Sequence, residues 1–329
     1  MLKNENHLLP LKKDLQRIAV IGPNANTTRL GDYSEAAHES SGEGMFEQIK
    51  QAVSTNTEVL FSDGENIPEA VAIAGKADVV ILGLGEWLKI SGEGFDRSDL
   101  NLPGKQEELL EAIVATGKPV VLVLQNGRPL SITWAAKNVP AILEAWYPGE
   151  SGGKAIAETL FGDNNPAGRL PVTFPRSVGQ LPDYYNHFPS KQGQYVEGDS
   201  SPLFVFGYGL SYTTFQYDDL NITTPSAGST NDVLVSCKIT NTGDRAGDEV
   251  VQLYVRQETA SVATPIKALK GFLRIHLQPE ESRTVTFNLK QSDLAVWNAN
   301  QEWQVEPGEY TVTVGKNSSD GLKDRFNLN

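Results

Sequence analysis

Short, almost continuous apolar runs are the feature that most constrains the fold of the first part of the chain. These runs are residues 17–22 (RIAVIG), 77–83 (ADVVILG), 119–125 (PVVLVLQ) and 141–145 (AILEA). Such strands must be buried on both faces, which is typical of a parallel sheet covered by helices. The segments with helical periodicity or composition between them are residues 45–53, 67–75, 105–116 and 151–161. This alternation predicts a doubly wound, mostly parallel α/β sandwich with right-handed crossovers.

The sequence pattern changes near Phe215. Beyond it, apolar and polar residues alternate in VLVSCKITNTG, EVVQLYVRQE, RTVTFNLK and EYTVTVG, with turn signals between them. This pattern predicts an antiparallel sandwich of roughly seven strands. Residues 162–214, rich in Gly, Pro and aromatic side chains, are expected to wrap over the surface. We therefore predict a connector at residues 1–13, an α/β domain at residues 14–215 and an all-β sandwich at residues 216–329.

The charge of the chain argues against several classes of partner. The formal net charge is −13 at pH 7, so long-range repulsion opposes binding to nucleic acid or to an acidic membrane surface. No apolar run approaches the ~18–20 residues that cross a bilayer. The first residues, MLKNENHLLPLKK, lack the apolar stretch of a signal peptide. A neutral ligand fits this composition best, and the compartment is left open.

The most unusual segment of the α/β part is residues 85–104, GEWLKISGEGFDRSDLNLPG, directly after a predicted strand. Loops at the carboxyl ends of parallel strands are where open α/β sheets bind ligands. The alternative is a solvated acidic loop in which Asp99 caps the next helix. A carboxylate between two glycines, such as Glu93 between Gly92 and Gly94, can reach outward into another pocket as an acid.

Consecutive motifs add a family resemblance. SGEGFDRSDLNLPGKQ, KPVVLVLQNGRPL, AWYPGESGGKAIAETLFGDNNPAGRLPVTFP and PLFVFGYGLSYTTF resemble the second domain of glycoside hydrolase family 3. DEVVQLYV, ALKGFLRI and PGEYTVTVG are similar to the fibronectin type III-like domain that follows it in many members. The motifs occur in the family's order over nearly the whole chain. The resemblance implies a retaining, exo-acting β-glycosidase for β-linked oligosaccharides or glycosides, with β-glucosidase ranked before β-xylosidase.

The resemblance also implies which residues carry the chemistry. Glu93 is the expected general acid/base, and Glu86 is the runner-up because the spacing of such loops varies across the family. Asp96 and Arg97 are expected to pair and brace the loop, although Arg97 could instead reach a sugar hydroxyl or steady the acid. Trp87 could stack on a sugar face or simply pack in the core.

Retaining hydrolysis needs a second carboxyl, the nucleophile, ~5–5.5 Å from the acid. Family members carry it on an N-terminal (β/α)8 barrel, and residues 1–13 resemble the segment that joins the barrel to the α/β domain. We therefore expect a nucleophile-bearing barrel as partner, in cis or in trans, and no hydrolysis by the chain alone. The non-enzyme alternative is an inert carbohydrate-binding or scaffold fragment. An apolar barrel-facing surface would also favour a homo-oligomer.

Metal and cofactor sites are not expected. The histidines His7, His38, His187 and His276 are scattered without the spacing of metal ligands. The strand at residues 17–22 leads into a glycine turn, as in nucleotide-binding units, but the full glycine fingerprint and any P-loop are missing.

Overall fold

A computed structural model describes residues 1–27, 29–31, 33–34, 43–189, 195–196, 198–224 and 232–328. The chain forms two compact units. The first comprises Met1–Pro166 with Phe174–Leu181, and the second comprises Ala167–Thr173 with Pro182–Asn329. These units are defined by spatial contact, so the predicted domain borders after residues 13 and 215 remain predictions.

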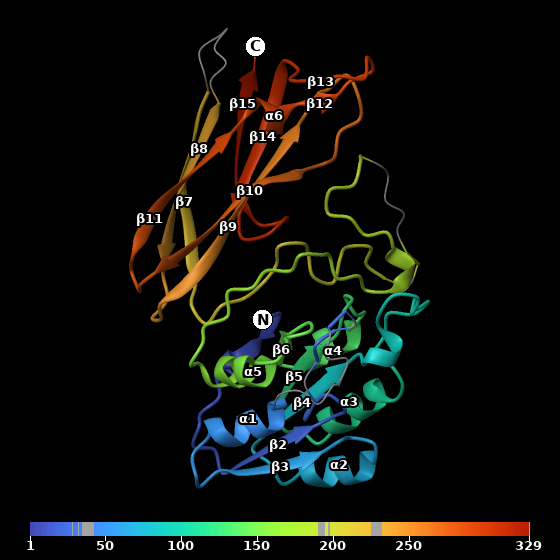
Figure 1. Cartoon of the computed structure of the whole chain (residues 1–329). Helices are drawn as coiled ribbons and strands as arrows, with labels where there is room; N and C mark the ends of the chain where they lie inside the picture. Colours follow the sequence, from blue (N-terminus) through green and yellow to red (C-terminus); the bar gives the residue numbers. More distant parts are fainter. Residues whose placement is uncertain are drawn as a thin grey trace. The chain divides into compact units, whose positions relative to one another are not determined.

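The first unit is built on one sheet of six strands in the order β1-β6-β5-β4-β2-β3 (Figure 1). All neighbouring strands are parallel except β1, which runs antiparallel to β6. The strands are β1 (Lys3–Asn4), β2 (Arg17–Ile21), β3 (Glu58–Ser62), β4 (Val79–Gly85), β5 (Val120–Gln125) and β6 (Ala141–Glu144). The predicted parallel strands are thus present, and β1 and β3 are added at the two edges.

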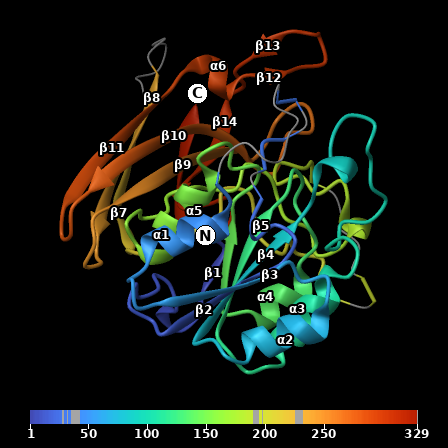
Figure 2. The ribbon, with the colours of Figure 1, turned by 60° about the horizontal axis from the view of Figure 1, so that its bottom comes forward.

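Helices cover both faces of this sheet (Figures 1 and 2). The helices are α1 (Met45–Ala52), α2 (Ile67–Ala74), α3 (Gln106–Val114), α4 (Thr133–Asn138) and α5 (Gly152–Phe161). Helices α1 and α5 pack together on one face, while α2 and α3 pack together on the other. Among the described residues, no helix has both the length and the apolarity needed to span a membrane.

The carboxyl ends of β2, β4, β5 and β6 lie at the same end of the sheet because these strands are parallel. Every residue of β4 and β5 is buried. Strand β1 is antiparallel, with Lys3 opposite Ile142 and Asn4 opposite Ala141. The amino end of β1 therefore points to this same end of the sheet, which we call the carboxyl rim.

The second unit contains an antiparallel sandwich. One sheet has the order β10-β9-β14-β15 and the other has the order β11-β8-β7, beside a small β12-β13 hairpin. The strands are β7 (Phe215–Thr223), β8 (Val233–Asn241), β9 (Gly247–Gln257), β10 (Ala268–Leu277), β11 (Ser282–Leu289), β12 (Val296–Trp297), β13 (Trp303–Gln304), β14 (Gly308–Gly315) and β15 (Gly321–Leu328). A short helix, α6 (Gln291–Leu294), precedes the hairpin. The predicted combination of an α/β layer with an all-β sandwich is confirmed.

Alternating residues of β8 form the centre of the sandwich core, as the sequence pattern requires. Val235, Cys237 and Ile239 are fully buried there against residues of both sheets. A buried ion pair lies within this unit. Arg169 Nη2 donates to Glu249 Oε2 at 2.9 Å, and Tyr217 Oη donates to Glu249 Oε1 at 2.9 Å. These bonds attach residues 167–173 to the sandwich.

Candidate active site

The loop that carries the predicted acid leaves the carboxyl rim after β4 at a tightly fixed glycine. Gly85 has φ of 132°, and a Cβ atom there would come within 2.1 Å of the Gln125 carbonyl oxygen. The side chain of Gln106 also brackets this residue, accepting from Gly85 N at 2.7 Å and donating to Gly85 O at 2.8 Å. The start of the loop is therefore set by β5 and by the first turn of α3.

Glu86, the next residue, is a buried anchor. Its side chain has no exposed surface. Oε1 accepts from Arg97 Nη1 at 2.9 Å and lies 3.4 Å from Arg128 Nη1, while Oε2 accepts from Gly127 N at 3.2 Å. We call Glu86, Arg97 and Arg128 the Glu86 clamp. A carboxylate that holds two guanidinium groups and has no access to solvent is poorly suited to protonate a leaving group, which disfavours Glu86 as the acid.

The predicted pairing of Arg97 with Asp96 is wrong. Arg97 instead binds Glu86 and donates to the Asn101 carbonyl oxygen at 2.8 Å, while Asp96 is exposed. An ion pair with a desolvated carboxylate is stronger than one screened by water, so the buried partner is favoured. Arg97 still braces the loop, but through Glu86.

The clamp holds the loop at several separate points. Arg128 Nη2 donates to the Phe95 carbonyl oxygen at 3.3 Å, so this guanidinium group joins the base of the loop to the residue two positions after the predicted acid. Together with the bond from Arg97 to the Asn101 carbonyl oxygen, this bond holds the part of the loop that follows Glu93, while Glu86 holds the part that precedes it.

Glu93 lies at the exposed tip of this loop. Gly94 has φ of 79°, and a Cβ atom at that position would meet nothing within 4 Å, so this glycine is required by the backbone turn and not by crowding. The phenol of Tyr33 donates to Glu93 Oε2 at 2.7 Å. Sequence reasoning missed Tyr33, because nothing in its local pattern distinguishes it from an ordinary loop aromatic.

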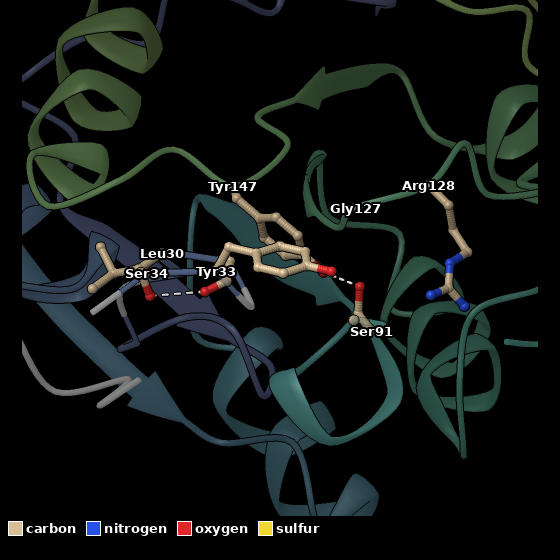
Figure 3. A pocket seen from close by; sticks show the side chains of 9 residues that line it. Leu30, Tyr33, Ser34, Ser91, Gly127, Arg128 and Tyr147 are labelled. Carbon is tan, nitrogen blue, oxygen red and sulfur yellow. Dashed lines mark hydrogen bonds between the residues drawn. The ribbon is translucent and has the colours of Figure 1, made fainter. Parts of the chain in front are cut away.

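A hollow of about 560 Å³ lies beside the tip. This volume falls within the range of small-molecule sites, ~300–1,000 Å³. Figure 3 shows Leu30 and Ser34 at one end and Arg128 at the other, with the Tyr147 ring between them. The hollow is lined by Leu30, Gly31, Tyr33, Ser34, Ser91, Gly92, Gly127, Arg128 and Tyr147. Trp87 is half-buried and does not belong to this lining, so its stacking role remains a prediction.

One wall of the hollow is packed without spare room. Tyr147 Oη donates a hydrogen bond to Ser91 Oγ. A Cβ atom on Gly127 would come within 2.7 Å of the Tyr147 ring and 2.9 Å of Ser91 Oγ, so only glycine fits between them. Through Ser91 this wall meets the loop after β4, two residues before Glu93.

A second carboxyl group near this wall belongs to Glu144, the partly buried last residue of β6. Oε1 accepts from Trp146 N at 2.9 Å, and Oε2 accepts from Asn126 Nδ2 at 3.3 Å. Burial raises the pKa of Glu144 to about 8, and the charge of Glu86 adds to the rise, so at neutral pH the group is largely protonated. The role of Glu144 could not be predicted from the sequence, because AILEA has the pattern of an ordinary apolar strand.

No metal site is formed by the part of the chain that the structure describes: no three His, Cys, Asp or Glu side chains there are grouped for a metal ion. His38, one of the four histidines considered above, lies outside the described residues.

Two family patterns match the chain. The Glycosyl hydrolase family 3 C-terminal domain matches residues 1–212, and the Fibronectin type III-like domain matches residues 249–318. The chain belongs to glycosyl hydrolase family 3. The predicted family is thereby confirmed, and it places the exposed Glu93 loop and its hollow in the C-terminal domain of a hydrolase family.

Named relatives in family 3 agree with this membership. A β-xylosidase of Formosa agariphila is 46% identical over 98% of this chain and 47% of its own length. A periplasmic β-glucosidase of Salmonella typhimurium is 38% identical over 100% of this chain and 48% of its own length. The chain thus spans about half the length of the curated relatives it matches.

Solved structures of β-glucosidases share the same fold. A β-glucosidase of Erythrobacter marinus superposes with a TM-score of 0.94 at 40% identity, over 99% of this chain and 48% of that one. A β-glucosidase of Listeria innocua in complex with glucose has a TM-score of 0.92 at 32% identity, over 99% and 47% of the two chains.

Proposed function

We propose that this chain forms the acid/base wall in the active site of a retaining, exo-acting β-glycosidase. Glu93 protonates the glycosidic oxygen as the bond to the anomeric carbon breaks, and a carboxylate from outside residues 1–329 attacks that carbon. Glu93 then removes a proton from the water that releases the sugar. The substrate is the terminal non-reducing β-D-glycosyl residue of an oligosaccharide or glycoside.

The observation that carries this proposal is the contrast between two acidic residues of one loop. Glu86 is fully buried under two guanidinium groups, whereas Glu93 stands at the exposed tip beside the hollow. A general acid must reach an oxygen atom on a ligand, and only the tip residue can do so. Because the start of the loop is anchored through Glu86, the positions open to the tip are restricted. This lowers the entropic cost of placing the acid against the substrate.

The direction of β1 is consistent with a site completed by another domain. Its amino end lies at the carboxyl rim, opposite the end of β6. A polypeptide joined ahead of Met1 would therefore start at the same rim as the acid-bearing loop. In such an enzyme a nucleophile-bearing barrel needs no long connector to face Glu93.

β-Glucosidase activity is the first candidate, and β-xylosidase activity is the second. The solved structures described above are β-glucosidases, whereas the relative with 46% identity is a β-xylosidase. The two substrates differ by the hydroxymethyl group of glucose, so a side-by-side assay of the two p-nitrophenyl glycosides ranks the candidates.

The test compares the chain alone with the chain combined with the barrel-bearing half of a family 3 relative. We expect no release of p-nitrophenol by the chain alone and measurable release from the glucoside or the xyloside after combination. Hydrolysis by the chain alone would disprove the shared site. A well-folded combination that stays inactive would favour the inert carbohydrate-binding or scaffold fragment.

Self-association is a separate part of the proposal. If the surface that faces the barrel is left uncovered, the chain should form a homo-oligomer that dissociates when the barrel-bearing half binds. Light scattering after size-exclusion chromatography measures this directly, and a monomer at all concentrations would contradict it.

A further inference from the structure

We propose that Glu144 is a positioning residue for the acid-bearing loop. Its carboxyl group holds the two turns that carry Gly127 and Tyr147. Through the hydrogen bond between Tyr147 and Ser91 it fixes the backbone two residues before Glu93. The effect of Glu144 on catalysis rests on the proposed function. Its effect on the position of Tyr147 and Ser91 does not, because it involves residues of this chain alone.

The first step is the geometry of the two turns. Glu144 is the last residue of β6, and its two carboxyl oxygens bind different segments: Oε1 accepts from Trp146 N and Oε2 accepts from Asn126 Nδ2. Asn126 also donates to the Arg128 carbonyl oxygen at 2.9 Å, which closes the turn around Gly127. One side chain therefore ties the turn after β5 to the segment after β6.

The second step is the strained backbone conformation at Trp146, which Glu144 stabilises through a hydrogen bond. Trp146 has φ of 54°, in the left-handed region that non-glycine residues seldom occupy and that strains the backbone. The hydrogen bond from Trp146 N to Glu144 Oε1 lies within this bend. Because the bend precedes Tyr147 directly, it determines the direction in which the Tyr147 ring leaves the rim.

The third step links this ring to the acid. The Tyr147 ring, Gly127 and Ser91 are in mutual contact with no room for an added methyl group, and Figure 3 shows the Tyr147 hydroxyl directed at Ser91. A shift of either turn must therefore move Ser91. Since Ser91 is buried and Glu93 is exposed, Ser91 is the point at which the packed wall joins the exposed tip.

The carboxyl group acts here as a short, neutral spacer with two oxygens. Its burial beside Glu86 keeps it protonated near neutral pH, which avoids a second negative charge next to the Glu86 clamp. Glutamine has the same reach and no charge, but its amide nitrogen is a donor, so it can accept from only one of the two N–H groups that bind Glu144. Aspartate keeps the carboxyl chemistry but is one methylene shorter and cannot span both turns.

The experiment follows Tyr147 by NMR in the 329-residue chain labelled with 13Cζ-tyrosine, where its signal is assigned by its loss in Tyr147→Phe. We expect Glu144→Asp to move this signal in the direction produced by Ser91→Ala, and Glu144→Gln, which keeps one of the two accepting oxygens, to move it by a smaller amount. Glu150→Gln, an exposed acid on the same segment, is the matched control. An unmoved Tyr147 signal in folded Glu144→Asp would overturn the proposal.

Asn126→Ala provides a second variant should Glu144→Asp fail to fold. It removes the amide on the other side of the carboxyl group and is also expected to shift the Tyr147 signal; a folded variant with no shift would overturn the proposal. In an active combined enzyme, Glu144→Asp should lower kcat for glycosides with poor leaving groups roughly tenfold, with KM little changed. If the combined wild-type enzyme is inactive, the proposed function fails while the NMR result still decides the role of Glu144.

Discussion

The phenol oxygen of Tyr33 lies 2.7 Å from Oε2 of Glu93, and its hydroxyl group donates a hydrogen bond to that carboxylate. Tyr33 comes from the segment after β2, whereas Glu93 comes from the loop after β4. Two neighbouring strands of the sheet thus meet at the tip that carries the proposed acid. Both side chains are exposed, so the bond orients the carboxylate and contributes little to folding.

Tyr33→Phe should therefore affect catalysis more than stability. Losing one hydrogen bond to an exposed carboxylate widens the range of orientations that Glu93 samples. We expect kcat of the combined enzyme to fall by roughly three- to tenfold, and the midpoint of urea unfolding to stay unchanged. Equal activity of Tyr33→Phe and wild type would show that the bond has no role in positioning Glu93.

Breaking the Glu86 clamp should destabilise the first unit. Glu86→Gln leaves two guanidinium groups close together in a buried site, which should cost about 3–5 kcal/mol of unfolding free energy. Glu108→Gln, on the exposed side of α3, is the matched control and should stay within about 0.5 kcal/mol of wild type. A loss below about 1 kcal/mol for Glu86→Gln would contradict the anchoring role.

The raised pKa of the Glu144 carboxyl group predicts a specific dependence of stability on pH. Its pKa is about 8 in the folded chain against 4.5 for an ordinary glutamate, so between these values the folded state binds more protons than the unfolded state. The stabilisation is complete below pH 4.5 and is lost as the pH rises towards 8. Urea unfolding at pH 5, 6.5 and 8 should show wild type losing stability relative to Glu144→Gln. A constant difference would contradict the raised pKa.

The buried ion pair of the sandwich gives a prediction independent of catalysis. Glu249→Gln should cost about 3 kcal/mol of unfolding free energy, because Arg169 stays buried without a countercharge. Glu309→Gln breaks the exposed pair with Arg325 and should cost less than about 1 kcal/mol. Similar losses for the two variants would show that burial does not set the strength of the Arg169–Glu249 pair.

The central strands could be predicted because each is apolar at nearly every position, which leaves burial on both faces as the only solution. The edge strands could not. Residues 58–62 (EVLFS) are only partly buried in β3, and β1 is two polar residues long, so neither carries a strong pattern. Their strand character comes from pairing with β2 and β6.

The exposed position of Glu93 could be predicted from the sequence, whereas the contacts of Glu86 could not. The glycines around Glu93 signal a projecting carboxylate, whereas the role of Glu86 depends on Arg97 and Arg128 reaching it from different loops. No local pattern encodes such convergence. Asp96, adjacent to Arg97 in sequence, looked like the better partner only because the burial of Glu86 was unknown.

The most direct test of the account is the leaving-group dependence of Glu93→Ala in the combined enzyme. An acid is needed most when the departing alcohol is weakly acidic, so hydrolysis of alkyl glycosides should fall roughly 10²–10⁴-fold. Hydrolysis of activated aryl glycosides, such as the dinitrophenyl glycoside, should fall far less in its first step. An equal fall for both substrates, or no fall for either, would show that Glu93 is not the acid.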